Sequence, residues 1–246
     1  MRLALVTDIH GNREAFAAVL ADAADQGADR IALLGDLVGY GPDPEWCVAT
    51  AIALVEQGAM VVRGNHDHAV SDLSESMSHN AAQAMEWTRP RLSPAQMTFL
   101  AHLPLTVTAG DILLVHASAN DPGAWNYVLS NLHARPSFAA TAARLIFCGH
   151  VHVPLLFCRD LGGAVREQAI RVDEPMRLQS TRRWLAVVGS AGQPRDGDPA
   201  AGYAVYDSES NDLTFRRVPY DCNVTAAKLR ASGLPEELAL RLVFGF

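Results

Sequence analysis

Polar side chains that can bind metal ions follow five short apolar runs of this sequence. The clearest case is residues 65–68, Asn-His-Asp-His, which come after an apolar run and Arg63-Gly64. A solvated turn needs only Ser, Lys or Glu, so residues of these types suggest a chemical role. The other four runs are residues 3–6, 31–34, 112–115 and 145–148. The side chains that follow the five runs are Asp8, His10, Asn12, Asp36, Asn65, His66, Asp67, His116, His150 and His152.

Each of these side chains has an ordinary structural explanation when it is taken alone. Asp8 suits a helix cap, Gly35-Asp36 suits a turn, and a single His116 suits packing. His150 and His152 alternate, so on a strand they would face one side. The carboxyl ends of strands in an open α/β sheet line one crevice. Because the pattern recurs after five strands, the sequence favours one shared site over five separate explanations.

The residue types at these positions indicate a metal centre. Imidazole nitrogen with carboxylate and amide oxygen suits Mn, Fe, Zn, Co or Ni better than Ca. No cysteine joins the set, which excludes a thiolate-based structural zinc site. Two divalent ions, two carboxylates and a bridging hydroxide leave a net charge of about +1, which attracts a phosphate oxyanion. Two ions that share one carboxylate would use all seven candidate ligands, which are Asp8, His10, Asp36, Asn65, His116, His150 and His152.

The elements that position these side chains alternate between strand and helix in residues 1–65. Asn12 predicts the N-cap of a first helix and Gly27 its C-terminal stop. Pro44 and Gly58 bound a second helix in the same way. Strand-helix-strand order implies parallel pairing with right-handed crossovers. The three strands are predicted at residues 3–6, 31–34 and 59–62.

The rest of the chain changes character after residue 70. A helical insertion is predicted at about residues 70–103, with Ser93-Pro94 as an N-cap and first helical residue. Residues 109–111, Ala-Gly-Asp, predict a hairpin, and the region after His152 predicts mostly antiparallel sheet. Two short helices, separated by residues 233–235, end the sequence. Because no repeat or linker interrupts it, we expect a single domain over residues 1–246.

Composition narrows the classes of function. The chain is 49% hydrophobic, which supports a sizeable core, and its formal net charge of −7 argues against a broad nucleic-acid surface. No apolar run is long enough for a signal peptide or a membrane span. The four cysteines form no CxxC pair, so we expect buried free thiols, a reducing compartment and a soluble cytoplasmic protein. They are Cys47, Cys148, Cys158 and Cys222.

Five blocks of this sequence, in order, resemble those of the calcineurin-like metallophosphoesterases. The blocks are Asp8-x-His10, Gly35-Asp36, Gly64-Asn65-His66-Asp67, His116 and Gly149-His150-x-His152. The resemblance spans roughly residues 1–160. Residues 188–197 are similar to the later loop of the small bacterial and archaeal phosphodiesterase branch. The resemblance implies an α/β (α+β mixed) fold: a four-layer αββα sandwich of two mixed β-sheets flanked by helices.

The resemblance also implies a role for each residue. His66 matches the catalytic histidine that does not bind metal, and Asp36 matches the bridging carboxylate. Manganese is among the metals that we expect. Asp67 either orients His66 or lies on the surface, and Arg195 either binds phosphate or is a plain turn residue. Asp8, His10 and His152 match the ligands of one ion, and Asn65, His116 and His150 those of the other. His68, His79, His102 and His133 are expected at the surface or in packing, with His79 nearest the cleft.

The activity that these matches imply is hydrolysis of a small phosphate-ester substrate by attack of a metal-bridging hydroxide. We expect a phosphodiesterase. Protein phosphatases of the family extend the second block to GDxVDRG, whereas residues 35–41 here are Gly-Asp-Leu-Val-Gly-Tyr-Gly and lack the second Asp and the Arg. The alternatives are a phosphomonoesterase, or phosphatase acting on phosphoproteins or nucleotides, and a non-catalytic scaffold of the same fold. Intact ligands and His66 argue against the scaffold.

Overall fold

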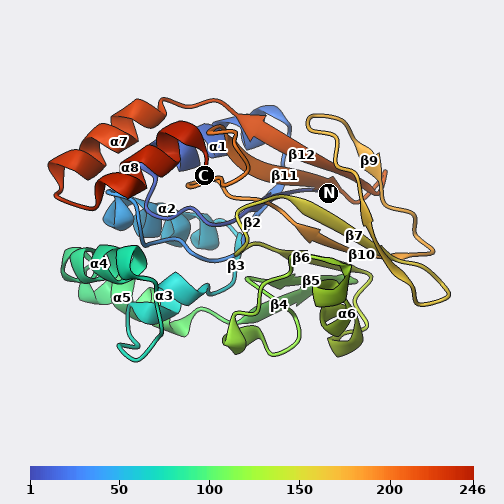
Figure 1. Ribbon diagram of the computed structural model, residues 1–246. Coiled ribbons are helices and arrows are strands. Elements are labelled where there is room, and N and C mark those ends of the chain that lie inside the picture. The colour runs from blue at the N-terminus through green and yellow to red at the C-terminus, as the bar shows by residue number, and fades with distance from the viewer.

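Two six-stranded sheets form the centre of the computed structural model, which describes residues 1–246 (Figure 1). The first sheet has the order β3-β2-β1-β11-β12-β9, and its strands are β1 (Arg2–Val6), β2 (Arg30–Leu33), β3 (Met60–Val61), β9 (Met176–Arg177), β11 (Ala201–Asp207) and β12 (Asp212–Val218). The second has the order β4-β5-β6-β10-β7-β8, and its strands are β4 (Thr106–Ala109), β5 (Ile112–Val115), β6 (Leu145–Cys148), β7 (Leu155–Arg159), β8 (Val165–Gln168) and β10 (Arg183–Val187). Both sheets are mixed: β1 runs parallel to β2 and antiparallel to β11, and β10 runs parallel to β6 and antiparallel to β7.

Helices cover the outer face of each sheet. The helices are α1 (Arg13–Asp25), α2 (Pro44–Glu56), α3 (Asn65–Ala69), α4 (His79–Thr88), α5 (Pro94–His102), α6 (Asn131–Ala140), α7 (Cys222–Ala231) and α8 (Glu236–Phe244), with 3-10 turns η1 (Arg89–Arg91) and η2 (Pro122–Ala124). Helices α1 and α2 pack on the first sheet and α6 on the second, while α3 to α5 and the pair α7 and α8 lie at one end of the sandwich (Figure 1). None of the helices combines the length and apolarity that crossing a membrane requires.

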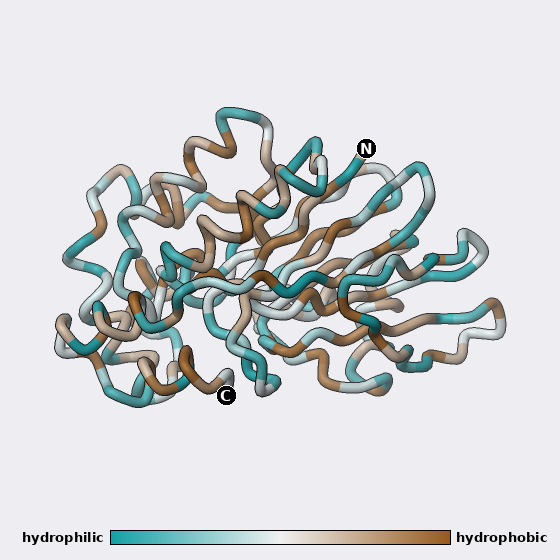
Figure 2. The backbone as a smooth tube through the Cα atoms, turned by 90° about the horizontal axis from the view of Figure 1, so that it is seen from above, coloured by the Kyte–Doolittle hydropathy of each residue, from teal (hydrophilic) through white to brown (hydrophobic).

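Three apolar layers hold the sandwich together. In β1, Leu3 and Leu5 face the second sheet, whereas Ala4 and Val6 face α1 and α2, because successive side chains of a strand point to opposite sides. A third cluster, which includes Phe138 of α6, lies beyond the second sheet. Hydrophobic segments follow the strands and inner helix faces in Figure 2, and hydrophilic segments follow the outer loops. The predicted four-layer αββα fold is confirmed.

Local signals placed the predicted helices correctly. The Asn12 side chain accepts a hydrogen bond from Ala15 N at 3.1 Å and so caps α1, and Gly27 follows that helix with a φ of 68°. Ser93 and Gln96 form a capping box at the start of α5. The sequence prediction missed β8 and β9 and did not give residues 65–69 as a helix. Strand β8 lies at a sheet edge, and its residues after the buried Val165 are polar, so its pattern carries little signal.

The predicted strands that carry the polar residues do not share one open sheet, and this part of the expectation was wrong. Strands β1, β2 and β3 belong to the first sheet, and β5 and β6 to the second. The ends of the two sheets meet because His150 N donates to Asp8 Oδ2 at 2.9 Å, and Ala191 N donates to Thr7 O at 2.9 Å. The crevice therefore lies between the sheets.

Candidate metal centre

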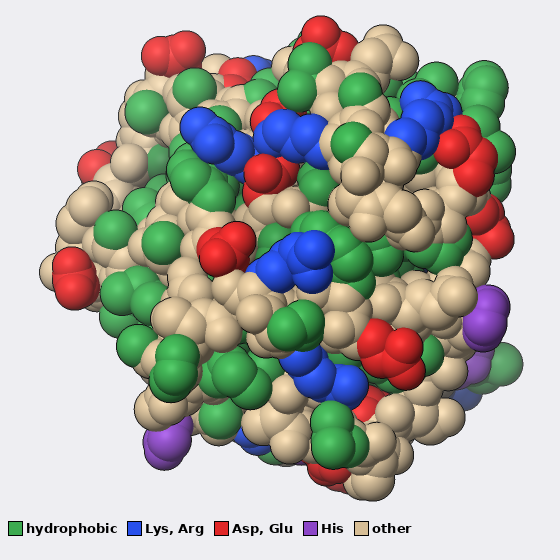
Figure 3. Space-filling view, turned by 90° about the vertical axis from the view of Figure 1, so that its left-hand side faces the viewer, with side chains coloured by type: hydrophobic (Ala, Val, Ile, Leu, Met, Phe, Trp, Pro, Cys, Tyr) green, Lys and Arg blue, Asp and Glu red, His purple; other side chains and the backbone are tan.

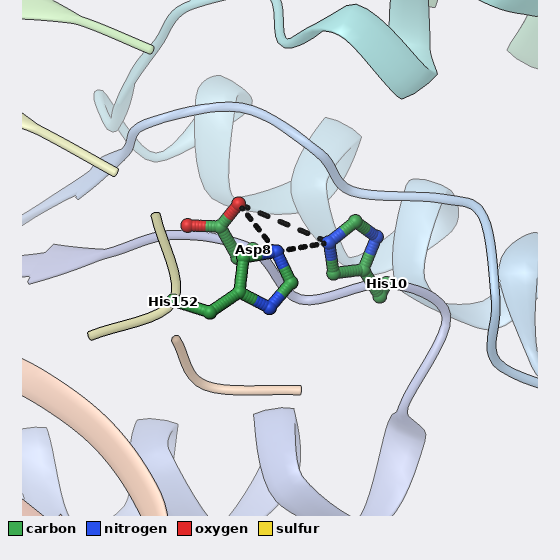
Figure 4. Close-up of side chains that lie close together, drawn as sticks. All are labelled: Asp8, His10 and His152. Atoms are coloured by element: carbon green, nitrogen blue, oxygen red, sulfur yellow. Dashed lines mark hydrogen bonds and ion pairs between the residues drawn. The ribbon is translucent and has the colours of Figure 1, made fainter. Parts of the chain in front are cut away.

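A first group of ligand-type side chains comes from the loops after β1 and β6. Asp8, His10 and His152 point toward one another in Figure 4, and all three are buried. His10 Nε2 lies 3.1 Å from His152 Nε2. Asp8 Oδ1 lies 3.8 Å from His10 Nε2 and 3.4 Å from His152 Nε2. These three atoms are close enough to bind one ion.

A second group lies beside the first. His116 Nε2 is 3.2 Å from Asn65 Oδ1 and 3.2 Å from His150 Nδ1. Asp36 Oδ2 lies 3.4 Å from His116 Nε2 and 3.7 Å from His10 Nε2, so one carboxylate oxygen stands between the two groups. The structure thus brings together all seven predicted ligands, four from the first sheet and three from the second.

The hydrogen bonds of the histidine rings test whether these residues suit a metal. Nδ1 of His10, His116 and His152 lies 3.1, 2.7 and 2.6 Å from the backbone carbonyls of Val38, Leu34 and Gln193, in that order. A carbonyl only accepts, so each Nδ1 donates, and in the neutral rings of His10 and His152 each Nε2 keeps a lone pair. Lone pairs that face each other at 3.1 Å repel unless an electrophile lies between them. Asp8 Oδ1 is also buried without a hydrogen-bond partner. The donor set therefore fits divalent metal ions, and the carbonyls fix the ring orientations.

The backbone is strained where it carries these side chains. Ten non-glycine residues have a positive φ, and five of them are predicted ligands: Asp8 (51°), His10 (50°), Asp36 (55°), His150 (69°) and His152 (64°). A residue in a sparsely populated backbone region costs on the order of 1–3 kcal/mol and persists only when its surroundings enforce it. The loops thus keep an unfavourable conformation that directs their side chains to one place.

Burial and mutual charge shift the acid–base behaviour of the two carboxylates. Burial raises the pKa of Asp8 to about 7, although the nearby His116 opposes it. Burial also acts to raise the pKa of Asp36. The charges of His116 and His66 outweigh this effect and hold the pKa of Asp36 well below its usual value. A cation bound beside Asp8 would oppose the effect of burial and lower the pKa of Asp8.

The pKa values of the histidines also shift in opposite directions. Burial lowers the pKa of His10 and His152 well below the usual value, and it lowers the pKa of His150 to about 3. Burial also acts to lower the pKa of His116, but the charge of Asp36 outweighs it and raises that pKa to about 9. Neutral imidazole is the form that binds metal, so most of this set is ready to do so.

His66 lies next to both groups. Its ring contacts the Tyr40 ring at 4.6 Å and meets His10 edge-on at 4.8 Å between centroids. Its Nδ1 is buried without a partner, and burial lowers its pKa. His66 also forms a possible metal group with His10 and Asp36. A Cβ at Gly39 would overlap the His66 ring, so Gly39 leaves room for this histidine.

Asp67 fits neither of its two predicted roles. It is fully buried, and its carboxylate accepts backbone N–H bonds from Asp36 at 2.8 Å, Leu37 at 2.9 Å and Gly64 at 3.0 Å. Asp67 therefore joins the loop after β2 to the loop after β3. It positions the backbone of Asp36 rather than the ring of His66.

A pocket of about 120 Å³ opens onto the two groups. It is lined by Asp36, Tyr40, Asn65, His66, Ser76, Met77, Ser78, Ala81, Tyr127, His150, His152 and Arg195. Arg195 donates to Gln193 Oε1 at 2.8 and 3.3 Å, and its guanidinium lies 5.7 Å from the centre of the Tyr40 ring. Figure 3 shows the end of the molecule that carries the α3–α5 and α7–α8 helices, where basic side chains alternate with acidic ones and form no continuous basic surface.

The sequence interpretation missed several residues of this pocket. The sequence does contain a signal that could have indicated Tyr40, because this residue lies between Gly39 and Gly41, directly after the Asp36 block. Tyr127 has none, since its loop follows no recognisable pattern. His79 does not line the pocket itself, although its neighbours Ser76–Ser78 do.

The fold and the paired ligand groups define a metallophosphoesterase. Residues 1–211 match the Calcineurin-like phosphoesterase superfamily domain, and the chain belongs to that superfamily, which uses divalent metals. It is 31% identical over 252 residues to an uncharacterized protein of Methanocaldococcus jannaschii, covering 99% of this chain and 98% of that one.

Two solved structures are similar over the whole chain. A metallophosphoesterase from Sphaerobacter thermophilus is 37% identical, with a TM-score of 0.89 and complete coverage of both chains. A hypothetical protein from Pyrococcus horikoshii is 19% identical, with a TM-score of 0.78 over 100% of this chain and 98% of that one, and it shows the shared fold alone.

Proposed function

We propose that this protein is a phosphodiesterase that uses two divalent transition-metal ions. The observation that carries the proposal is the position of Asp36 Oδ2, which lies 3.7 Å from His10 Nε2 in one group and 3.4 Å from His116 Nε2 in the other. Asp8, His10 and His152 would hold one ion, and Asn65, His116 and His150 the other. When bound, such ions supply Lewis acidity and lower the pKa of coordinated water.

The remaining side chains of the pocket act on the substrate. Arg195 lines the pocket and brings a positive charge that attracts a phosphate oxygen. A bound phosphate raises the pKa of His66 by its negative charge, which prepares that ring to give a proton to the leaving oxygen. Asp67 does not hold this ring, because its carboxylate accepts from the backbone of Asp36, Leu37 and Gly64.

Preference for a diester is supported by the second sequence block. Gly39 and Tyr40 occupy the positions where protein phosphatases of the family have a second Asp and an Arg. The Tyr40 ring instead packs against His66 and His10. Arg195 is then the one arginine or lysine that lines the pocket, which suits a singly charged diester better than a doubly charged monoester. The four free cysteines support the further proposal of a reducing, cytoplasmic location.

A metal-by-substrate matrix tests this function. Protein stripped by a chelator is reconstituted with Mn, Fe, Zn, Co or Ni, and bound metal is counted alongside hydrolysis of bis-p-nitrophenyl phosphate and p-nitrophenyl phosphate. We expect two ions per chain, no activity without metal, and diester hydrolysis at least comparable to monoester hydrolysis. Full activity with one bound ion contradicts the two-metal proposal. A consistent monoester preference favours a phosphomonoesterase.

A further inference from the structure

The size of the pocket limits which part of a substrate it can enclose. Its volume is about 120 Å³, and its floor consists of ligand-type side chains and His66. A phosphate group fits this space, but an organic group esterified to it must extend to the rim. The lining residues other than His66 and the ligand-type side chains, called the rim from here on, are Tyr40, Ser76, Met77, Ser78, Ala81, Tyr127 and Arg195. Recognition of that organic group therefore depends on the rim.

Tyr127 is the most exposed ring on this rim. It stacks on His150 with 4.1 Å between centroids and 18° between planes, so one face is covered by a predicted metal ligand. The residue is nevertheless 51% exposed. The rest of the loop is fixed: Val128 is buried, and Ser118 N donates to Asn126 O at 3.1 Å. A flat apolar surface is thus held still, next to the phosphate position, with one face free.

We propose that Tyr127 is a specificity-determining residue that stacks on the planar ring of one ester group, a nucleobase or an aryl group. The inference rests on the proposed function, because the phosphate must lie on the metal-binding groups for its ester group to reach Tyr127. Stacking on an exposed aromatic ring recognises any planar group without hydrogen bonds. The polar side chains of Ser76 and Ser78, which also line the pocket, are available to a sugar or another polar linker.

Two ligands that differ only by a base test the proposal. Adenosine monophosphate and ribose 5-phosphate share the phosphate and the sugar, so the ratio of their dissociation constants isolates the base. Calorimetry on Mn-reconstituted protein measures both constants for the wild type, Tyr127→Leu and Tyr127→Phe. Leucine keeps the apolar bulk but removes the ring, and phenylalanine keeps the ring but removes the hydroxyl.

We expect the wild type to bind adenosine monophosphate roughly 5- to 150-fold more tightly than ribose 5-phosphate, the range that stacking of one base supplies. Tyr127→Leu should abolish this ratio without changing the affinity for ribose 5-phosphate, and Tyr127→Phe should keep it. If Tyr127→Leu weakens the affinities for adenosine monophosphate and ribose 5-phosphate equally, Tyr127 acts only by supporting His150. A wild-type ratio near one also overturns the proposal. Hydrolysis of bis-p-nitrophenyl phosphate by the same preparation reports the proposed function separately.

Discussion

Replacing His66 by alanine, and its neighbour Asn65 by alanine, distinguishes a residue that donates a proton from one that binds metal. His66 is 4% exposed, lies outside the seven predicted ligands, and keeps an unpartnered Nδ1. If it protonates the leaving oxygen, His66→Ala should keep both metal ions and lose turnover. Asn65→Ala is the matched control. Because Asn65 Oδ1 lies 3.2 Å from His116 Nε2, its loss should weaken one ion, and high metal concentration should partly restore activity.

The structure sets the size of both effects. A positioned proton donor contributes roughly 10²- to 10⁴-fold to turnover, so this is the expected loss in His66→Ala. The change in stability should be small, because removing the ring loses packing against Tyr40 but also removes a buried polar atom whose missing partner costs about 1–3 kcal/mol. The two effects oppose each other. We expect the melting temperature to change by less than about 4 °C, the shift produced by about 1 kcal/mol in a chain of this size.

The assay uses two diesters, one with p-nitrophenol and one with an alkyl alcohol or nucleoside as leaving group. An acidic p-nitrophenol departs without a proton, so the loss in His66→Ala should be smallest for it and largest for the alkyl or nucleoside ester. Bound metal, melting temperature and turnover are measured for both variants. His66 also stands within ligand distance of His10 and Asp36, so metal analysis is decisive. Loss of metal in His66→Ala, or a defect that is the same for both leaving groups, refutes the assigned role.

Three further perturbations have expected outcomes. Gly39→Ala places a Cβ against the His66 ring, at a φ of +90°, so turnover should fall while bound metal is retained; unchanged turnover would show that His66 need not stay where it is. Chelation should lower the melting temperature by about 5–10 °C per site, since a ligand at 100 times its dissociation constant stabilises by about 2.7 kcal/mol, and calorimetric scans that coincide with and without chelator would contradict this. Burial acts to raise the pKa of Asp22, but hydrogen bonds from Arg216 and Tyr203 outweigh burial, so the pKa is lowered overall. The folded state is therefore stabilised by ionised Asp22 above the unfolded pKa of about 4, and this stabilisation is lost as pH falls through the folded pKa. Asp22→Asn should therefore make urea unfolding less dependent on pH below about 4, and an unaltered pH profile would show that this ion pair is energetically neutral.

The sequence predicted which side chains converge because their signal is local. Each lies directly after an apolar run, and the run, the strand and the strand end are set by neighbouring residues. Asp8 and His116 could be placed in this way without knowing which strands pair. The signals that mark helix ends are equally local, as the Asn12 cap and Gly27 show.

The features that were missed depend on contacts between distant segments. Asp67 was misjudged because its partners, Asp36 N and Leu37 N, lie about 30 residues away and are backbone atoms without sequence signature. Tyr127 is placed at the pocket by stacking on His150. The loop that carries Tyr127 has no periodicity, so the sequence does not reveal this contact. The division of the ligand-bearing strands between two sheets also lies beyond local pattern, because it depends on β1 pairing with β11 and β6 pairing with β10.

That division explains how seven ligand-type side chains can be brought to one place. Neighbouring strands of one sheet lie about 4.8 Å apart, so their ends present side chains in a row and leave one side of an ion open. A second sheet, packed about 10 Å away, supplies donors from the opposite side. Here β1, β2 and β3 lead into Asp8, His10, Asp36 and Asn65, and β5 and β6 lead into His116, His150 and His152. Gly149 permits this closure, because a Cβ at that position would overlap Thr7 and Asp8 from the other sheet. The sandwich therefore brings ligand-type side chains to one position from both sheets.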